Sequence, residues 1–265
     1  MKTNTSYLDA QCSQLMLITL SLLFALPGLT QEPRNFFPFF GSTDEGNSSL
    51  SATFTGSPSS TRFQQVYGAS GFISEGGNTQ FLIHRIQLRT DGTGPGFFSQ
   101  FPAFQINFST TTRPIDDLSA TFIDNIGSDD TAVVPLGQLQ VSGSYVRGNE
   151  PQLMTTFITF STPFYYDPSQ GNLLMDIRNF GGGTTSWGVP PFSGPAYVDA
   201  SRIEGDLISS VIGSSVNALS GSVSTVGLIS QFWVTQVPEP STVTLLLVGL
   251  IAFGFSARSR QTRKG

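Results

Sequence analysis

The sequence predicts an all-β protein built as a single, jelly-roll-like β-sandwich. Short segments in which apolar and polar residues alternate recur between residues 61 and 236, and Gly, Pro, Asn and Asp cluster between them. No long segment has the 3.6-residue period of an amphipathic helix. Many short antiparallel strands with Phe-rich inner faces are most stable as two packed sheets, which is why a sandwich is expected.

The individual strands are predicted from side-chain periodicity. In residues 80–88 apolar side chains occur at both odd and even positions, which predicts a strand buried largely on both faces. Phe104, Ile106 and Phe108 alternate with polar residues, as in a strand with one wet face. Further strands are expected at residues 137–144, 155–161, 173–178, 197–203 and 228–235. Residues 116–126 and 205–219 are compatible with short helices.

Two apolar ends bracket this domain. Lys2 precedes an apolar run over residues 15–26 that ends at Pro27 and Gly28, which predicts a secretory signal peptide over residues 1–30. An uncleaved N-terminal anchor is the alternative. Residues 31–60 are expected to form a loop-rich lead-in, in which the aromatic cluster 35–40 packs on the domain as an edge segment.

The exported part is acidic and lacks cysteine. Cys12 lies before the predicted apolar run, so no thiol remains for a disulfide or a metal after processing. Residues 32–240 carry eight Arg, no Lys and seventeen Asp and Glu, which is a net charge of −9. This charge argues against a nucleic-acid partner.

Catalytic candidates are few. His84 is the chain's single histidine and the one side chain expected to titrate near neutral pH. A Ser-His-Asp triad is one interpretation, but the sequence has no Gly-x-Ser-x-Gly turn to expose a nucleophile. A packed or surface histidine is the other, and it is favoured. We therefore expect a protein that is not an enzyme.

An acidic loop at residues 124–130 is the candidate metal site, and no other cofactor is expected. It places five oxygen-bearing side chains within seven residues, together with a glycine that permits a turn. The predicted calcium ligands are Asp124, Asn125, Asp129 and Asp130. No Glu closes a twelve-residue EF-hand loop, so a solvated turn whose Asp and Asn side chains cap the backbone is the alternative.

Trp187 lies in a loop rich in glycine and proline, between residues 181 and 195. An aromatic side chain on a polar loop can stack on a sugar, which makes Trp187 a candidate glycan contact. The loop can equally cover one end of the sandwich, with Trp187 packed beneath it.

The C-terminal residues 237–265 have a distinct composition. Val237, Pro238, Glu239 and Pro240 precede an uncharged segment at residues 242–257, and Arg258, Arg260, Arg263 and Lys264 follow it. Sixteen helical residues reach roughly 24 Å, a little less than the hydrocarbon core of a membrane. Because basic residues are retained in the cytoplasm, we expect a transmembrane helix with the domain outside.

This tail resembles the PEP-CTERM sorting signal of Gram-negative bacteria, the substrate of exosortases. Residues 62–67, 108–111, 118–122 and 163–169 more loosely resemble segments shared by PEP-CTERM ectodomains. The resemblance implies export across the inner membrane, a membrane-anchored intermediate, and exosortase cleavage near Pro238 to Pro240.

The cleaved protein is then expected at the cell surface or in the extracellular matrix. By association it would act beside exopolysaccharide in a biofilm, in a structural or adhesive role. A secreted carbohydrate-binding or carbohydrate-acting domain is the alternative.

Overall fold

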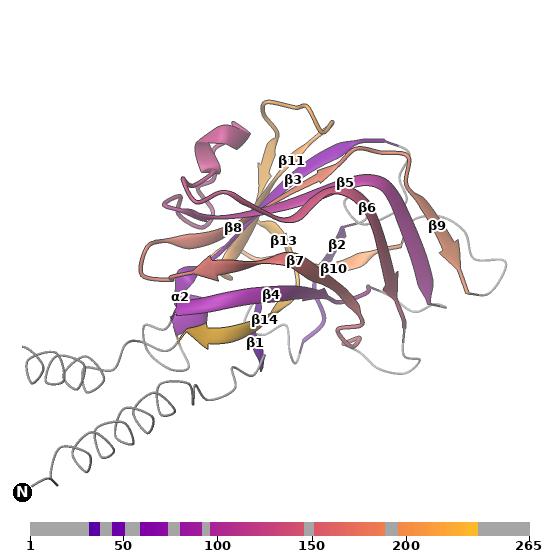
Figure 1. Cartoon of the computed structure of the whole chain (residues 1–265), viewed down its shortest axis with the longest axis horizontal. Coiled ribbons are helices and arrows are strands. Elements are labelled where there is room, and N and C mark those ends of the chain that lie inside the picture. Colours follow the sequence, from indigo (N-terminus) through magenta and orange to yellow (C-terminus); the bar gives the residue numbers. More distant parts are fainter. Residues whose placement is uncertain are drawn as a thin grey trace, which may run out of the picture. The chain divides into compact units, whose positions relative to one another are not determined.

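The computed structural model describes residues 32–37, 44–50, 59–73, 80–91, 96–145, 151–188 and 196–237. Within these ranges the chain forms antiparallel sheets and very little helix (Figure 1). None of the helices described is long and apolar enough to cross a membrane. The predicted signal peptide and C-terminal membrane helix lie outside the described residues.

The described strands form three sheets. The four-stranded sheet contains, in spatial order, β1 (Glu32–Phe37), β14 (Ser230–Val237), β4 (Gln80–Leu88) and β7 (Thr156–Tyr166). The seven-stranded sheet contains, in spatial order, β12 (Ser222–Ser224), β11 (Ile208–Gly213), β3 (Thr61–Tyr67), β8 (Asn172–Asn179), β5 (Phe97–Thr111) and β6 (Thr131–Gly143), with β9 (Thr184–Trp187) also paired to β5. The three-stranded sheet is β13 (Val226–Leu228), β10 (Val198–Arg202) and β2 (Ser48–Leu50).

The two larger sheets pack face to face through buried aromatic rings. Phe232 of β14 lies edge-on to Tyr67 of β3, with ring centroids 4.9 Å apart, and edge-on to Phe108 of β5 at 6.2 Å. Phe108 also meets Phe160 and Phe164 of β7, at 5.0 and 5.8 Å. Because these contacts join strands of different sheets, the predicted all-β sandwich is confirmed.

Eight strands have the connectivity of a jelly roll. β1, β4, β7 and β14 form the four-stranded sheet in the order β1-β14-β4-β7, and the other sheet contains the run β3-β8-β5-β6. Along the chain, each of these strands passes to the opposite sheet except at the β5–β6 hairpin. The strands β9 to β13 are inserted between β8 and β14.

The prediction that residues 80–88 are buried on both faces is wrong. Phe81, Ile83, Ile86 and Leu88 are buried in one core, while the residues between them are only partly covered. Along β14 the ladder passes from Ile83–Val234 directly to Arg85–Trp233, so His84 is the extra residue of a β-bulge. The ladder to β7 is interrupted at the same place. A bulge reverses the alternation of side chains, which brings odd and even positions onto the same face.

The two predicted helices are not formed as expected. Residues 205–219 contain the strand β11, which pairs with β3 on one side and β12 on the other. Its Ile208 and Val211 are buried on opposite faces, an environment that favours β-branched residues in extended backbone. Residues 116–126 contain only the four-residue 3₁₀ helix η2 (Phe122–Asn125).

The outer face of the seven-stranded sheet is covered near η2. A second apolar cluster forms there from Val66, Leu118, Phe122, Leu174 and Val211. The Arg62 guanidinium lies 4.6 Å above the Phe122 ring, and the Gln64 side chain donates a hydrogen bond to the Phe122 carbonyl. This cover explains why β3 and β8 are buried on both faces.

The described part of the lead-in forms two strands. β1 is an edge strand of the four-stranded sheet and contains residues 35–37 of the aromatic cluster, of which Phe37 is buried in the core. Residues 38–40 of the cluster lie outside the described ranges. The Phe37 ring contacts Tyr67, Phe232 and Phe72, the last in the short helix α2 (Ala69–Ile73). β2 pairs with β10.

Asp206, in the turn before β11, is expected to make stability depend on pH. Its carboxylate is only 9% exposed and accepts hydrogen bonds from the Ser201 hydroxyl and the Ile208 amide. Burial raises its pKa from the ordinary 3.8 to about 6. Between these pH values the folded protein binds more protons than the unfolded chain. The free energy of unfolding therefore falls by about 3 kcal/mol at most as the pH rises through this range, and it is constant above it.

The variant Asp206→Asn removes this titration while keeping the shape of the side chain. We expect its free energy of unfolding, measured with urea between pH 4 and 7, to fall less with rising pH than that of the wild type. Glu204→Gln, at an exposed position of the same turn, is the control. An identical pH slope in wild type and Asp206→Asn would contradict the assignment.

Candidate functional site

The hydrogen-bond partner of His84 is the hydroxyl of Thr235, and this pair does not form a Ser-His-Asp triad. The ring nitrogen Nε2 of His84 lies 2.9 Å from the Thr235 hydroxyl on the neighbouring strand β14. Partial burial lowers the pKa of His84, so the neutral ring is favoured at pH 7. This geometry agrees with the predicted packed histidine, which here occupies the bulge of β4.

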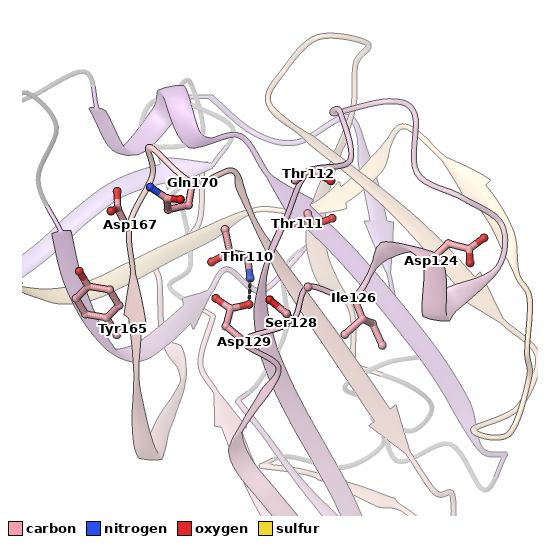
Figure 2. A pocket seen from close by; sticks show the side chains of 11 residues that line it. Thr110, Thr111, Thr112, Asp124, Ile126, Ser128, Asp129, Tyr165, Asp167 and Gln170 are labelled. Carbon is pink, nitrogen blue, oxygen red and sulfur yellow. Dashed lines mark hydrogen bonds between the residues drawn. The ribbon is translucent and has the colours of Figure 1, made fainter.

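An open groove of about 470 Å³ lies at the end of the sandwich where β5 ends (Figure 2). Its lining is rich in hydroxyls and carboxylates, and comes from the end of β5, the acidic loop and the β7–β8 turn: Thr110, Thr111, Thr112, Asp124, Ile126, Gly127, Ser128, Asp129, Tyr165, Asp167 and Gln170. Asp167 is held by hydrogen bonds from the Ser169 hydroxyl and amide, which lower its pKa. The groove therefore keeps anionic oxygen atoms at its rim.

Two of the four predicted calcium ligands line this groove, but each is engaged in local bonding. Asp129 Oδ1 accepts the Thr110 amide at 2.7 Å, and Asp124 Oδ2 accepts the Ser119 hydroxyl at 2.9 Å. In Figure 2 the Asp124 side chain lies apart from Asp129, beyond Ile126.

The other two predicted ligands, Asn125 and Asp130, have different hydrogen-bond partners. Asn125 is fully buried: its oxygen accepts the Ser119 amide, and its NH₂ group donates to the Gln64 side chain and the Ser119 carbonyl. Asp130 accepts a hydrogen bond from Asn107, and burial raises its pKa.

The four predicted ligands are therefore not brought to one point. Within the described ranges, Asp124, Asp129 and Asp130 do not form a group of three carboxylates close enough to share an ion. The loop instead has the properties of the alternative, in which Asp and Asn side chains fix a turn through backbone hydrogen bonds.

Trp187 ends β9, beside the first residues of β5. Its ring stacks on Tyr145 at 6.3 Å and 23°, and it meets the buried Phe97 at 6.1 Å. One face of the indole is thus covered by the protein itself, as expected for a residue that closes the end of the sheet. A glycan contact at Trp187 stays a prediction, and residues 189–195 of its loop lie outside the described ranges.

The sorting tail begins directly at the end of an interior strand. β14 lies between β1 and β4, and its last pairs are Gln236 with Phe81 and Val237 with Gln80. The ladder therefore extends to the residue before Pro238. Pro238, Glu239, Pro240 and the basic residues Arg258, Arg260, Arg263 and Lys264 lie outside the described residues.

Together, the fold and the tail define a β-sandwich protein with a C-terminal sorting signal. Residues 236–261 match the PEP-CTERM protein-sorting motif, so the chain is a PEP-CTERM sorting-motif protein. The motif implies an exported surface protein whose sorting and processing depend on an exosortase.

Other comparisons add little. No curated protein matches the chain. It is similar to a chain in a structure of the Gx strain of infectious bursal disease virus, with 12% identity and a TM-score of 0.12, over 81% of this chain and 50% of that one. The chain thus spans half the length of the viral chain, and a likeness this weak carries no argument.

Sequence reasoning missed one group of carboxylates, formed by Glu45, Asp91 and Asp199. These residues are far apart in the sequence and belong to no local motif. No signal in the sequence could have found the group, because only the pairing of β10 with β2 and with the end of β4 brings it together.

Proposed function

We propose that this protein is a non-enzymatic surface or matrix protein of a Gram-negative bacterium. In this proposal the membrane holds it through the C-terminal helix until an exosortase cleaves near Pro238 to Pro240. The released domain then takes a structural or adhesive role beside exopolysaccharide. The observation that carries the proposal is the sorting motif at residues 236–261, which continues directly from the folded domain.

The short connection supports processing close to the membrane. Four residues, 238–241, separate the last paired residue of β14 from the apolar segment that begins at residue 242. A fully extended chain of four residues spans roughly 14 Å. The domain would therefore lie against the membrane surface before cleavage and leave it only when the tail is cut.

The adhesive part is supported by two strongly exposed apolar side chains on adjoining segments. Ile123 and Leu219 are 69% and 83% exposed. Their segments adjoin, because the Phe122 amide donates a hydrogen bond to the Leu219 carbonyl. Exposed apolar side chains on adjoining segments favour contact with another surface.

Processing can be tested on the full chain in a host that carries an exosortase. Cells are separated into membrane, surface and matrix fractions, and the C-terminus of the mature protein is determined by mass spectrometry. We expect it to end near Pro238 to Pro240, with the body recovered in the polysaccharide-containing matrix. Glu239→Ala is expected to accumulate uncleaved in the membrane, whereas the control Glu204→Ala, at an exposed glutamate of the domain, is processed normally.

Two outcomes would contradict separate parts of the proposal. Recovery of residues 263–265 on the mature, membrane-held wild type would show a plain anchor and remove exosortase cleavage. A cleaved body found free in the medium, with none in the matrix fraction, would leave sorting intact and remove the matrix role.

A further inference from the structure

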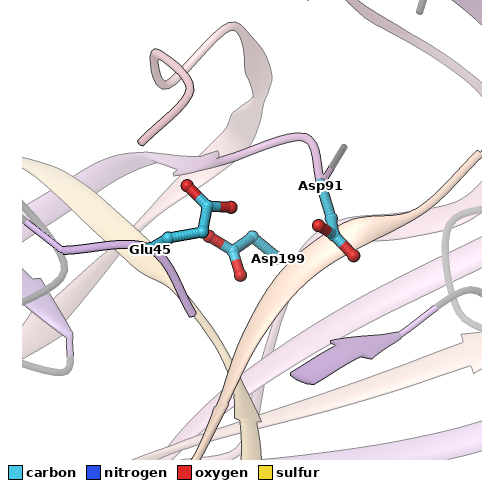
Figure 3. A group of neighbouring side chains, drawn as sticks. All are labelled: Glu45, Asp91 and Asp199. Carbon is cyan, nitrogen blue, oxygen red and sulfur yellow. The ribbon is translucent and has the colours of Figure 1, made fainter. Parts of the chain in front are cut away.

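Three carboxylates from distant segments meet beside the three-stranded sheet (Figure 3). Glu45 precedes β2, Asp91 follows the end of β4, and Asp199 lies within β10. Each offers an oxygen atom, and these atoms lie within 4.8 Å of one another. The backbone holds them there, since the Asp91 amide donates to the Tyr197 carbonyl and the Asp199 amide to the Arg89 carbonyl.

Asp199 is the buried centre of this group. The side chain is fully buried, and its Oδ2 accepts hydrogen bonds from Arg89 Nε at 2.6 Å and from the Gly46 amide at 3.3 Å. Its other oxygen, Oδ1, is also buried and accepts no hydrogen bond from the described residues. A buried carboxylate oxygen without a partner is costly, so Oδ1 points to a ligand that supplies positive charge.

The backbone at Gly46 passes very close to Asp199 Oδ1. A Cβ atom at position 46 would collide with Asp199 Oδ1 and with the Ala200 carbonyl, so only glycine lets the backbone pass. The segment before β2 therefore wraps the carboxylate closely, in a cradle that is already formed.

The balance of charge identifies the ligand class. The Arg89 guanidinium pairs with Asp199, and the three carboxylates together with this guanidinium carry a net charge of −2. Arg89 is fixed by Asp199 Oδ2 and by the Asp44 carbonyl, to which it donates at 2.7 Å.

We propose that Glu45, Asp91 and Asp199 bind one calcium ion, which joins the segment before β2 to the end of β4 and to β10. Ca²⁺ takes six to eight oxygen ligands and accepts carboxylates in one- or two-oxygen contact, so three carboxylates supply between three and six of these oxygens. Mg²⁺ requires a stricter octahedron and keeps more water, so it fits less well. Extracellular modules bind Ca²⁺ at roughly 10⁻⁴ to 10⁻³ M, which suits an exported protein.

The test is calorimetric titration of the metal-free full chain with calcium chloride. We expect about one equivalent to bind, with weaker binding of magnesium chloride. Asp91→Asn removes one carboxylate at a half-exposed position, so the variant is expected to fold and to bind calcium at least tenfold more weakly. Glu45→Gln is a second such variant. Asp129→Asn, in the acidic loop, is the matched control and is expected to bind like the wild type.

The inference is overturned if the wild type binds no calcium at millimolar concentration by equilibrium dialysis. It is also overturned if Asp91→Asn and Glu45→Gln, shown by circular dichroism to be folded, both bind like the wild type. Loss of binding in Asp129→Asn alone would assign the ion to the acidic loop and would likewise remove this site.

Discussion

Phe232→Ala is expected to lower the free energy of unfolding by about 4 kcal/mol, because large-to-small substitutions in a packed core lose both burial and contacts. Phe232 is fully buried in β14 and contacts rings from four other segments: Phe37, Tyr67, Phe72 and Phe108. It joins the two large sheets at the strand from which the sorting tail continues.

Urea unfolding of the full chain measures this loss. Phe98→Ala, in β5, is the matched control, since Phe98 is 38% exposed and its loss is expected to cost about 1 kcal/mol or less. Equal losses in the two variants would show that the sheets do not depend on the ring of Phe232.

Arg89→Met is expected to lower the free energy of unfolding by about 3–5 kcal/mol, measured in chelator so that the value refers to metal-free protein. The Arg89 side chain is almost fully buried against Asp199. Methionine fills much of the same space but leaves a buried carboxylate without its counter-charge, and the Asp44 carbonyl without its donor.

Arg202→Met, at an exposed position of β10, is the control and is expected to change stability by about 0.5 kcal/mol or less. The double variant Arg89→Met with Asp199→Leu is expected to be more stable than Arg89→Met alone, because it removes the uncompensated charge. If Arg89→Met alone were as stable as the wild type, Asp199 would be neutral in the folded protein.

The alternation of side chains predicted much of the fold because it directly reports which face of a strand is buried. Phe104, Ile106 and Phe108 are all in the core, as expected, and so are Phe232 and Val234 near the end of the domain. Such local patterns hold wherever a strand stays regular.

The same reasoning failed where the pattern depends on neighbours. A bulge at His84 changes which residues of β4 point inward, and nothing in residues 80–88 marks it. β11 looked compatible with a helix, since the strands that pair with it are distant in the sequence. Propensity is a weak guide when pairing partners decide the backbone.

By itself, the sequence determined the sorting signal, because a motif, an apolar segment and basic residues act in linear order and need no fold. Only the tertiary structure decided which carboxylates meet. Asp124, Asn125, Asp129 and Asp130 are neighbours in the sequence, yet their hydrogen bonds direct them apart. Glu45, Asp91 and Asp199 are distant in the sequence, and strand pairing brings their oxygens together. The physical reason is that a metal site needs oxygen atoms at one point in space, which chain spacing alone does not specify.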